Sequence, residues 1–166
     1  VAPNIGCGEC RFCRGGNENL CARTEALGIT LDGGFAQQVV IPAAAVEHGN
    51  IIRLNPELSP DTATLLEPLA CVVRGQDKAM VAGRERVVVA GCGPIGLLHI
   101  ALARARGAEL IIASDRSATR RAAAERAGAD VTVDWETADP ERVVAEMTGH
   151  AGADVVIAAA PSPELQ

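Results

Sequence analysis

Short apolar runs alternate with helical segments throughout the second half of this 166-residue chain, and this alternation restricts the possible folds more than any other feature. We predict four β-strands, over residues 87–90, 110–113, 131–133 and 154–158. Three helices are expected between them, over residues 94–106, 117–128 and 140–147. Continuous apolar strands joined by helices are typical of a parallel sheet with helices on both faces. The sequence therefore predicts an α/β fold.

A glycine-rich turn lies between the first of these strands and the helix that follows it. Its sequence, Gly91-Cys92-Gly93-Pro94-Ile95-Gly96, is a G-x-G-x-x-G motif in the strand–turn–helix context that a dinucleotide-binding site requires. Gly91 would allow the tight turn, Gly93 would let the backbone approach a pyrophosphate, and Gly96 would let the helix pack closely on its strand. Pro94 suits the first helical position, where its missing N–H has no partner inside the helix. We therefore predict that this motif, including Ile95, binds a dinucleotide.

An acidic residue follows the second predicted strand at the spacing that a dinucleotide site needs. Asp115 lies 19 residues after Gly96, close to the ~20 residues expected for the carboxylate that binds the adenosine ribose. A carboxylate there would repel the 2′-phosphate of NADP, so we expect NAD to be the cofactor. Arg116 and Arg120 argue in the other direction, because arginines near this point accommodate a 2′-phosphate, and we include both as candidate cofactor-binding residues. The alternative is that Asp115 only caps the next helix, beside Ser117.

Four of the six cysteines lie close together near the start of the chain. Their spacing, C-x2-C-x2-C-x7-C, places Cys7, Cys10, Cys13 and Cys21 in one predicted loop. Four thiolates in a short loop can close a tetrahedral zinc site, and a closed site of this kind is structural. The alternatives are a disulfide pair, which the otherwise cytosolic character of the chain disfavours, and an iron–sulfur cluster. A ferredoxin-type motif would place its fourth cysteine at position 17, which is Asn17, so we favour zinc.

Short strands and two helices are expected in the segment between the cysteines and the α/β region. Apolar residues between positions 26 and 54 form short runs, such as Val39-Val40-Ile41, that are separated by turn-forming residues. This spacing predicts antiparallel strands with tight turns. Ser59 and Pro60 predict the start of a helix, and a second helix is expected from about residue 68 to residue 80.

Charge and hydropathy exclude several partners. The net charge of −6 offers no electrostatic surface for nucleic acid or for an anionic membrane. The longest mostly apolar stretch, residues 87–103, is interrupted by glycine and proline and does not predict a transmembrane helix. The chain begins at Val1 without the features of a signal or transit peptide. Both ends read as cut, so we expect a fragment of a longer, cytoplasmic protein.

Several motifs together resemble one protein family. The segment from Cys7 to Cys21 resembles the structural-zinc lobe of the medium-chain zinc-dependent alcohol dehydrogenases, and Gly33-Gly34-Phe35-Ala36 resembles the strand entry that follows that lobe. Glu67-Pro68-Leu69-Ala70-Cys71 is similar to a segment of the polyol (sorbitol or L-iditol) dehydrogenases and of related threonine dehydrogenases. The glycine motif and Asp115 then follow in the order of the family. The resemblance covers the whole chain.

This resemblance implies a domain organisation and an activity. Residues 1–58 would be the C-terminal part of a GroES-like catalytic β domain, residues 59–82 connecting helices, and residues 83–166 the first half of an NAD-binding Rossmann domain. The implied reaction is oxidation of a small-molecule, polyol-like secondary alcohol, with hydride transfer to NAD. A catalytic zinc would act in addition to the structural zinc, and the full-length protein is expected to form a homodimer or homotetramer.

Glu67 is the one residue that matches the catalytic zinc zone of this family. It would be a zinc ligand or the partner of a zinc-bound water, and the alternative is a solvated glutamate between two helices. The other ligands of the family are a cysteine and a Gly-His-Glu motif that lie before the structural-zinc lobe. No Gly-His-Glu motif occurs in this sequence, so these ligands would precede Val1 and the chain alone is expected to be inactive. Alternative functions are a threonine or sugar-phosphate dehydrogenase of the same family, a non-catalytic zinc- and dinucleotide-binding module, and an iron–sulfur electron carrier.

Several other residues receive structural interpretations. Cys71 and Cys92 are expected to pack as small hydrophobic residues. Trp135, just after the third strand, would either border the adenine site or cap the sheet. Arginines of the predicted helices are expected to form a charged outer face; these are Arg104, Arg106, Arg120, Arg121 and Arg126.

Overall fold

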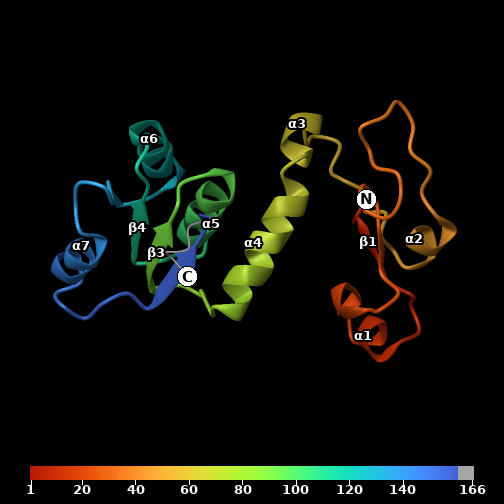
Figure 1. The fold of residues 1–166 in the computed structure, drawn as a ribbon, viewed down its shortest axis with the longest axis horizontal. Helices are drawn as coiled ribbons and strands as arrows, with labels where there is room; N and C mark the ends of the chain where they lie inside the picture. The colour runs from red at the N-terminus through yellow and green to blue at the C-terminus, as the bar shows by residue number, and fades with distance from the viewer. Residues whose placement is uncertain (161–166) are drawn as a thin grey trace. The chain divides into compact units, whose positions relative to one another are not determined.

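Four parallel strands form one sheet in the computed structural model, which describes residues 1–160 (Figure 1). They are β3 (Arg86–Ala90), β4 (Leu110–Ser114), β5 (Val131–Val133) and β6 (Val155–Ala158), in the order β5-β4-β3-β6. Val88 of β3 pairs with Ile112 of β4 on one side and with Val156 of β6 on the other. The predicted α/β fold is confirmed, and each bound of the predicted strands lies within one residue of the observed bound.

Two helices cover one face of this sheet. They are α5 (Pro94–Ala105) and α6 (Ala118–Ala127), which pack against each other and against the strands. The fully buried Ile100 of α5 and Ala124 of α6 belong to the same hydrophobic core as Val89 of β3. This core lies directly beneath the glycine-rich turn, because β3 leads into that turn and α5 leads away from it.

The opposite face of the sheet is only partly covered among residues 1–160. A cleft of about 1030 Å³ is lined by Val88 and Val156 of the sheet and by Val144 of α7 (Pro140–Met147). We call it the sheet cleft. Val156 is 68% exposed, so the expectation of helices on both faces holds for one face only. The cleft leaves the apolar side chains of this second face without a tightly packed helix.

Two further helices precede the sheet in the sequence. They are α3 (Pro60–Ala63) and α4 (Leu66–Lys78). The Thr62 N–H donates to Ser59 Oγ (3.2 Å), which confirms the predicted helix start. α4 begins and ends two residues earlier than predicted and packs against α5. No described helix is long and apolar enough to cross a membrane, and α4, the longest, has 13 residues.

A buried polar contact joins α4 to α5. Gln76 is fully buried, and its Nε2 donates to the His99 carbonyl oxygen (2.8 Å) and lies 3.4 Å from His99 Nδ1. The Gln76 amide nitrogen carries only donors, so the contact suits a neutral His99 whose Nδ1 accepts. Burial also lowers the pKa of His99. Both features favour the uncharged imidazole in the folded chain.

The stability of the unit that contains α4 and α5 should therefore depend on pH between about 5 and 7. The unfolded chain binds a proton at His99 near pH 6.5, whereas the folded chain resists it. The contribution is fully present above about pH 6.5, and the free energy of unfolding should fall below that pH by at most ~1.4 kcal/mol per pH unit for one proton. Urea denaturation at about pH 7.5 and 5.5 measures this effect.

His99→Gln should remove this pH dependence, because it removes the titrating group. His150→Asn is the matched control, since His150 is exposed and Asn tolerates its positive φ of 64°. A pH dependence that persists in His99→Gln and disappears in His150→Asn would contradict the prediction.

The first of two compact units, Val1–Ala63, contains little regular structure; the second is Thr64–Gln166. In the first, β1 (Asn4–Ile5) pairs antiparallel with β2 (Glu25–Ala26). The short helices of this unit before α3 are α1 (Arg11–Arg14), η1 (Glu18–Leu20) and α2 (Ala43–Glu47).

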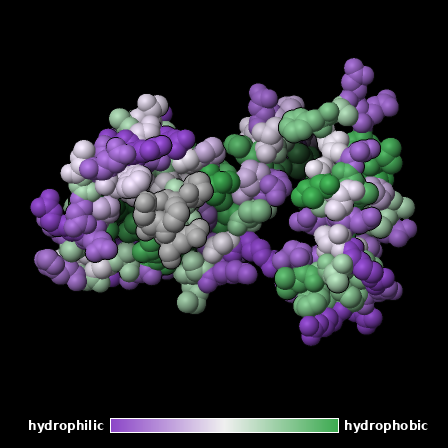
Figure 2. Space-filling view, in the orientation of Figure 1, coloured by the Kyte–Doolittle hydropathy of each residue, from purple (hydrophilic) through white to green (hydrophobic). Residues whose placement is uncertain are grey.

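The antiparallel strands predicted between residues 26 and 54 are wrong beyond Ala26. This segment contains α2, which starts after Pro42 in a run of alanines that favours a helix, and one isolated bridge between Leu27 and Leu31. A strand needs a hydrogen-bonded partner, and the described part of the chain offers these apolar runs none. Their side chains stay exposed, as at Phe35 and Val40. Figure 2 shows hydrophobic side chains at the surface of this unit.

Candidate functional site

The four clustered cysteines converge on one point. The Sγ atoms of Cys7, Cys10, Cys13 and Cys21 all lie within 4.8 Å of one another. The distance from Cys13 Sγ is 3.5 Å to Cys10 Sγ and 3.9 Å to Cys7 Sγ. A tetrahedral zinc ion with Zn–S bonds of ~2.3 Å holds its sulfurs about 3.8 Å apart. The sulfurs are free thiols rather than disulfides, and their spacing fits one tetrahedral ion.

Backbone N–H groups favour negative charge at two of these sulfurs. Those of Glu9 and Cys10 lower the pKa of Cys7 to about 6. The Arg23 N–H donates to Cys21 Sγ (3.3 Å), and the pKa of Cys21 is lowered first by a bond from the Cys7 backbone and then by this one. The pKa of Cys13 is raised to about 12, chiefly by burial. The loop thus offers thiolate-stabilising donors, as a cation site requires.

The glycine-rich turn has the geometry that its sequence predicts. Gly91 has a φ of +100°, and its N–H donates to the Ser114 carbonyl oxygen (2.7 Å). A Cβ added to Gly96 would lie 1.9 Å from the Gly91 carbonyl oxygen, so only glycine fits there. A Cβ added to Gly93 would meet no atom within 4 Å. The backbone of Gly93 is therefore open to a ligand at the N-terminus of α5.

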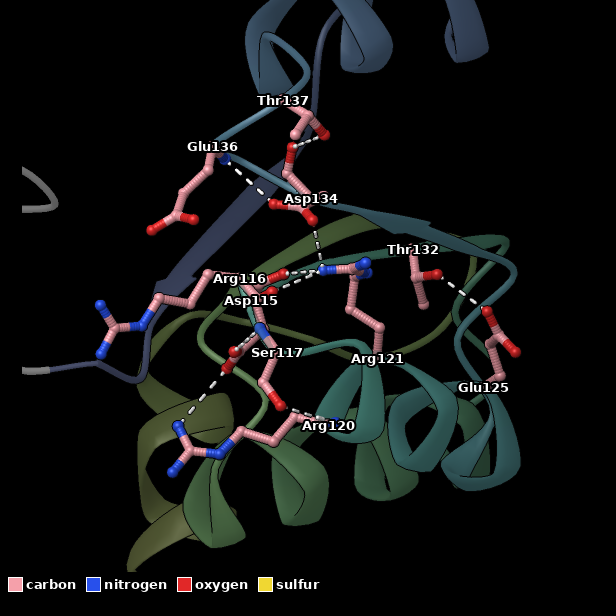
Figure 3. A network of polar contacts seen from close by, with 10 residues as sticks. All are labelled: Asp115, Arg116, Ser117, Arg120, Arg121, Glu125, Thr132, Asp134, Glu136 and Thr137. Atoms are coloured by element: carbon pink, nitrogen blue, oxygen red, sulfur yellow. Dashed lines mark hydrogen bonds and ion pairs between the residues drawn. The ribbon is translucent and has the colours of Figure 1, made fainter.

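Asp115 is joined directly to this turn. Its side chain is 7% exposed; Oδ2 accepts from the Cys92 N–H and Oδ1 from the Ser117 N–H, both at 2.9 Å. Arg120 Nη1 lies 3.7 Å from Oδ2 (Figure 3). Asp115 therefore bonds the backbone of Ser117, whose own side chain caps α6 by accepting from the Arg120 N–H, and it also lies against the glycine turn.

The sheet cleft brings together part of the predicted cofactor-binding set. Gly91, Asp115, Arg116 and Arg120 line it, together with Trp135. Gly93, Pro94, Ile95 and Gly96 belong to the turn but do not line the cleft. Trp135 thus lies beside candidate cofactor-binding residues, as the first of its two interpretations expects.

Glu67 belongs to no group of three or more candidate metal ligands among residues 1–160. It is exposed in the first turn of α4, and Cys71 Sγ donates to its Oε1 (3.6 Å). The expectation that Cys71 packs as a hydrophobic residue is wrong, because Cys71 is exposed on the same side of the helix as Glu67. Cys92 is buried as expected, and burial raises its pKa to about 11.

Two family profiles match the chain. Residues 1–50 match the alcohol dehydrogenase GroES-like domain, and residues 94–166 match the zinc-binding dehydrogenase domain. They match on the two sides of α3 and α4, in the order that the motifs have here. The chain belongs to the zinc-dependent medium-chain dehydrogenase family.

Curated members of this medium-chain dehydrogenase family resemble the chain over most of its length. The erythritol/L-threitol dehydrogenase of Mycolicibacterium smegmatis is 36% identical over 155 residues, which are 92% of this chain and 42% of the relative. The L-threonine 3-dehydrogenase of Bacillus subtilis is 38% identical over 153 residues, with the same coverage. The chain thus spans less than half the length of these relatives.

A solved medium-chain dehydrogenase shares the fold. The NADP-bound structure of a zinc-binding dehydrogenase from Sinorhizobium meliloti 1021 superposes with a TM-score of 0.85 and 39% identity, over 98% of this chain and 47% of that one. Zinc and a nicotinamide dinucleotide are therefore the ligands that the family supports.

The charged outer face expected for the helix arginines is wrong for several of them. Arg121 is 19% exposed and forms an ion pair with Asp134 (2.9 Å). Arg104 donates to the carbonyl oxygens of Ala108 and Gly128. The side-chain pairing pattern of helices gave no sign of these contacts, because the partners lie in loops outside the two helices.

Proposed function

We propose that the chain forms the structural-zinc lobe and the adenosine-binding half of an NAD-dependent oxidoreductase. The observation that carries this proposal is the bond from the Cys92 N–H to the Asp115 carboxylate (2.9 Å). It fixes the distance between a pyrophosphate-binding turn and a ribose-binding acid. The domain organisation that we propose is a GroES-like part over residues 1–58, connecting helices over 59–82 and half of a Rossmann domain from residue 83.

The turn and the acid would divide the work of holding NAD. The positive end of α5 and the open backbone of Gly93 would face the pyrophosphate. A carboxylate has about four acceptor positions, and the N–H groups of Cys92 and Ser117 take two at Asp115. Two positions stay available for the ribose hydroxyls. The negative charge disfavours a 2′-phosphate, although Arg120 weakens that effect.

We propose a structural zinc at the four clustered cysteines. Its support is the sulfur spacing, since a single ion reaches four sulfurs that lie within 4.8 Å, whereas an iron–sulfur cluster distributes its thiolates over several iron atoms. The stabilised thiolates of Cys7 and Cys21 match the deprotonated ligands that zinc requires.

The reaction that we propose for the whole protein is the reversible oxidation of a polyol-like secondary alcohol. The carbinol carbon gives a hydride to the nicotinamide and the hydroxyl group loses its proton, so that alcohol and NAD⁺ yield ketone, NADH and H⁺. A catalytic zinc, when bound, would act as a Lewis acid on the substrate oxygen. Glu67 would serve as one of its ligands or hold a water beside it. The similarity to erythritol/L-threitol dehydrogenase supports this substrate class, and the similarity to L-threonine 3-dehydrogenase supports threonine as the second candidate.

Titration with NAD and NADP tests the cofactor part of this proposal. The chain should bind NAD more tightly than NADP, and Asp115→Asn should narrow that preference at least about tenfold, or ~1.4 kcal/mol, because it removes the charge that repels the 2′-phosphate. Isothermal titration calorimetry measures both dissociation constants.

Asp139→Asn is the matched control for this titration. Asp139 also lines the sheet cleft and bonds a helix N-terminus, through the Glu141 N–H (3.0 Å), but it has no contact with the glycine turn. Equal narrowing in both variants, or no change in Asp115→Asn, would refute the assigned role of Asp115. A chain that binds neither dinucleotide would refute the proposed function.

A further inference from the structure

One arginine that does not line the sheet cleft holds two of the loops that do. Arg121 Nη1 donates to the carbonyl oxygens of Asp115 (2.8 Å) and Arg116 (3.0 Å), and it lies 2.9 Å from Asp134 Oδ2 (Figure 3). The Arg121 and Asp134 side chains are 19% and 25% exposed. A single, largely buried guanidinium nitrogen therefore connects the segment after β4 to the segment after β5.

Asp134 passes this connection on to the loop that carries Trp135. Its carbonyl oxygen accepts from the N–H groups of Thr137 (3.1 Å) and Ala138 (2.8 Å), and its Oδ1 accepts from the Glu136 N–H (3.1 Å). The loop over residues 134–138 is thus folded around the carboxylate that Arg121 binds. Arg116 and Trp135 both line the cleft, one from each connected segment.

We propose that Arg121 is a positioning residue that fixes the two sides of the adenosine pocket relative to each other, and thereby sets discrimination at the ribose 2′ position. This inference rests on the proposed dinucleotide function. Arg121 acts on the backbone of Asp115 and Arg116, two of the residues that we propose to face the ribose 2′ position. Without it, both carbonyl oxygens lose their donor, and the segment can shift relative to the glycine turn and to Trp135.

The same fold contains a matched arginine at the other edge of the sheet. Arg104 also contacts two backbone carbonyl groups and one carboxylate: those of Ala108 (3.2 Å), Gly128 (3.0 Å) and Asp130 (2.5 Å). These groups precede β4 and β5, whereas the partners of Arg121 follow those strands. Loss of Arg104 removes a comparable set of bonds, but at the edge remote from the glycine turn.

The test uses two probes for the adenosine end, 5′-AMP and adenosine 2′,5′-bisphosphate, on the full chain. Arg121→Met should weaken 5′-AMP binding about tenfold and narrow the preference for 5′-AMP over the bisphosphate at least about fivefold. Arg104→Met should lower the melting temperature about as much as Arg121→Met does. It should leave the preference for 5′-AMP over the bisphosphate unchanged. Arg121→Lys keeps a positive charge and a donor nitrogen opposite Asp134 but carries them on a flexible stem instead of a rigid planar group, so it should give an intermediate preference.

The outcomes separate the two proposals. An unchanged preference in a folded Arg121→Met or Arg121→Lys protein overturns the positioning role and leaves the dinucleotide site in place. An equal change in Arg104→Met also overturns it, because the effect would then follow from lost stability alone. Wild-type protein that binds neither probe overturns the dinucleotide function and this inference together.

Discussion

Replacing Cys13 by Ser is expected to abolish zinc binding and to unfold the segment around the four cysteines. Cys13 Sγ lies 3.5 Å and 3.9 Å from two of the other sulfurs, so its loss opens the tetrahedron, and a serine hydroxyl is a poor substitute for a thiolate. The first unit has little else to hold it. Its buried hydrophobic residues among those described are Ile5, Cys21, Ala26 and Ala45, and two of these are alanines.

The size of the expected effect follows from that small core. Structural zinc contributes about 10–16 kcal/mol of binding free energy in peptides that fold only with the metal, far more than a few buried alanines can supply. Elemental analysis should give about one zinc per wild-type chain and less than about 0.1 in Cys13→Ser. Limited proteolysis should then cut within residues 1–63 of the variant and spare the second unit.

Cys71→Ser is the control, because it removes a cysteine that is exposed and remote in sequence from the cluster. It should retain the full zinc content and the wild-type cleavage pattern. Zinc retained at the wild-type ratio in Cys13→Ser would rule out the four-cysteine site. If the wild-type protein contained iron with inorganic sulfide, the result would refute the zinc site and support the iron–sulfur cluster.

The second unit could be predicted from sequence because its strands and helices satisfy their requirements locally. Val87 and Val89 of β3 share a core with Ile100 of α5, the next helix in sequence, and Ser117 and Gly128 mark both ends of α6. Each strand finds its neighbour within this unit. Pattern and fold therefore agree at every step of the βα alternation.

The first unit could not be predicted in the same way, because its apolar runs do not pair with each other. Val40 is 87% and Phe35 fully exposed, which no alternation rule anticipates. The alanines after Pro42 instead form α2, since alanine needs no partner strand to favour a helix. Apart from the helix start at Ser59, the information about this unit came from the cysteine spacing, which depends on coordination chemistry rather than on burial.

For the candidate site, sequence identified the residues that bear the chemistry but not those that hold them. The spacing between Gly96 and Asp115 in the sequence identified Asp115 as a candidate ribose-binding residue. Its hydrogen bond from the Cys92 N–H could be seen only in the structure. Arg121 appeared to be a surface residue, because its partners are backbone oxygens and an aspartate 13 positions away. Contacts between loops at one edge of a sheet have no sequence period that could reveal them.

Gly96→Ala is expected to have the largest effect of any single substitution in the glycine-rich turn. The added Cβ would lie 1.9 Å from the Gly91 carbonyl oxygen, and this oxygen is fixed because the Gly91 N–H is bonded to Ser114. α5 or the turn must move, at about 3 kcal/mol, the upper part of the range for overpacked cores. Urea denaturation should show this loss, and calorimetry should show no NAD binding.

Gly93→Ala separates the binding role of the turn from its packing role. A Cβ there meets no protein atom within 4 Å, and φ of −72° with ψ of −178° is extended backbone that alanine adopts. Stability should change by less than about 1 kcal/mol, since the weaker N-cap and the stiffer unfolded chain offset each other. NAD affinity should nevertheless fall at least about tenfold, because the methyl group would occupy the space of the pyrophosphate. Wild-type NAD affinity in Gly93→Ala would place the pyrophosphate elsewhere. Equal destabilisation of Gly93→Ala and Gly96→Ala would show that the turn tolerates no added Cβ at either position, so that the contact between Gly96 and Gly91 would not explain the loss of stability.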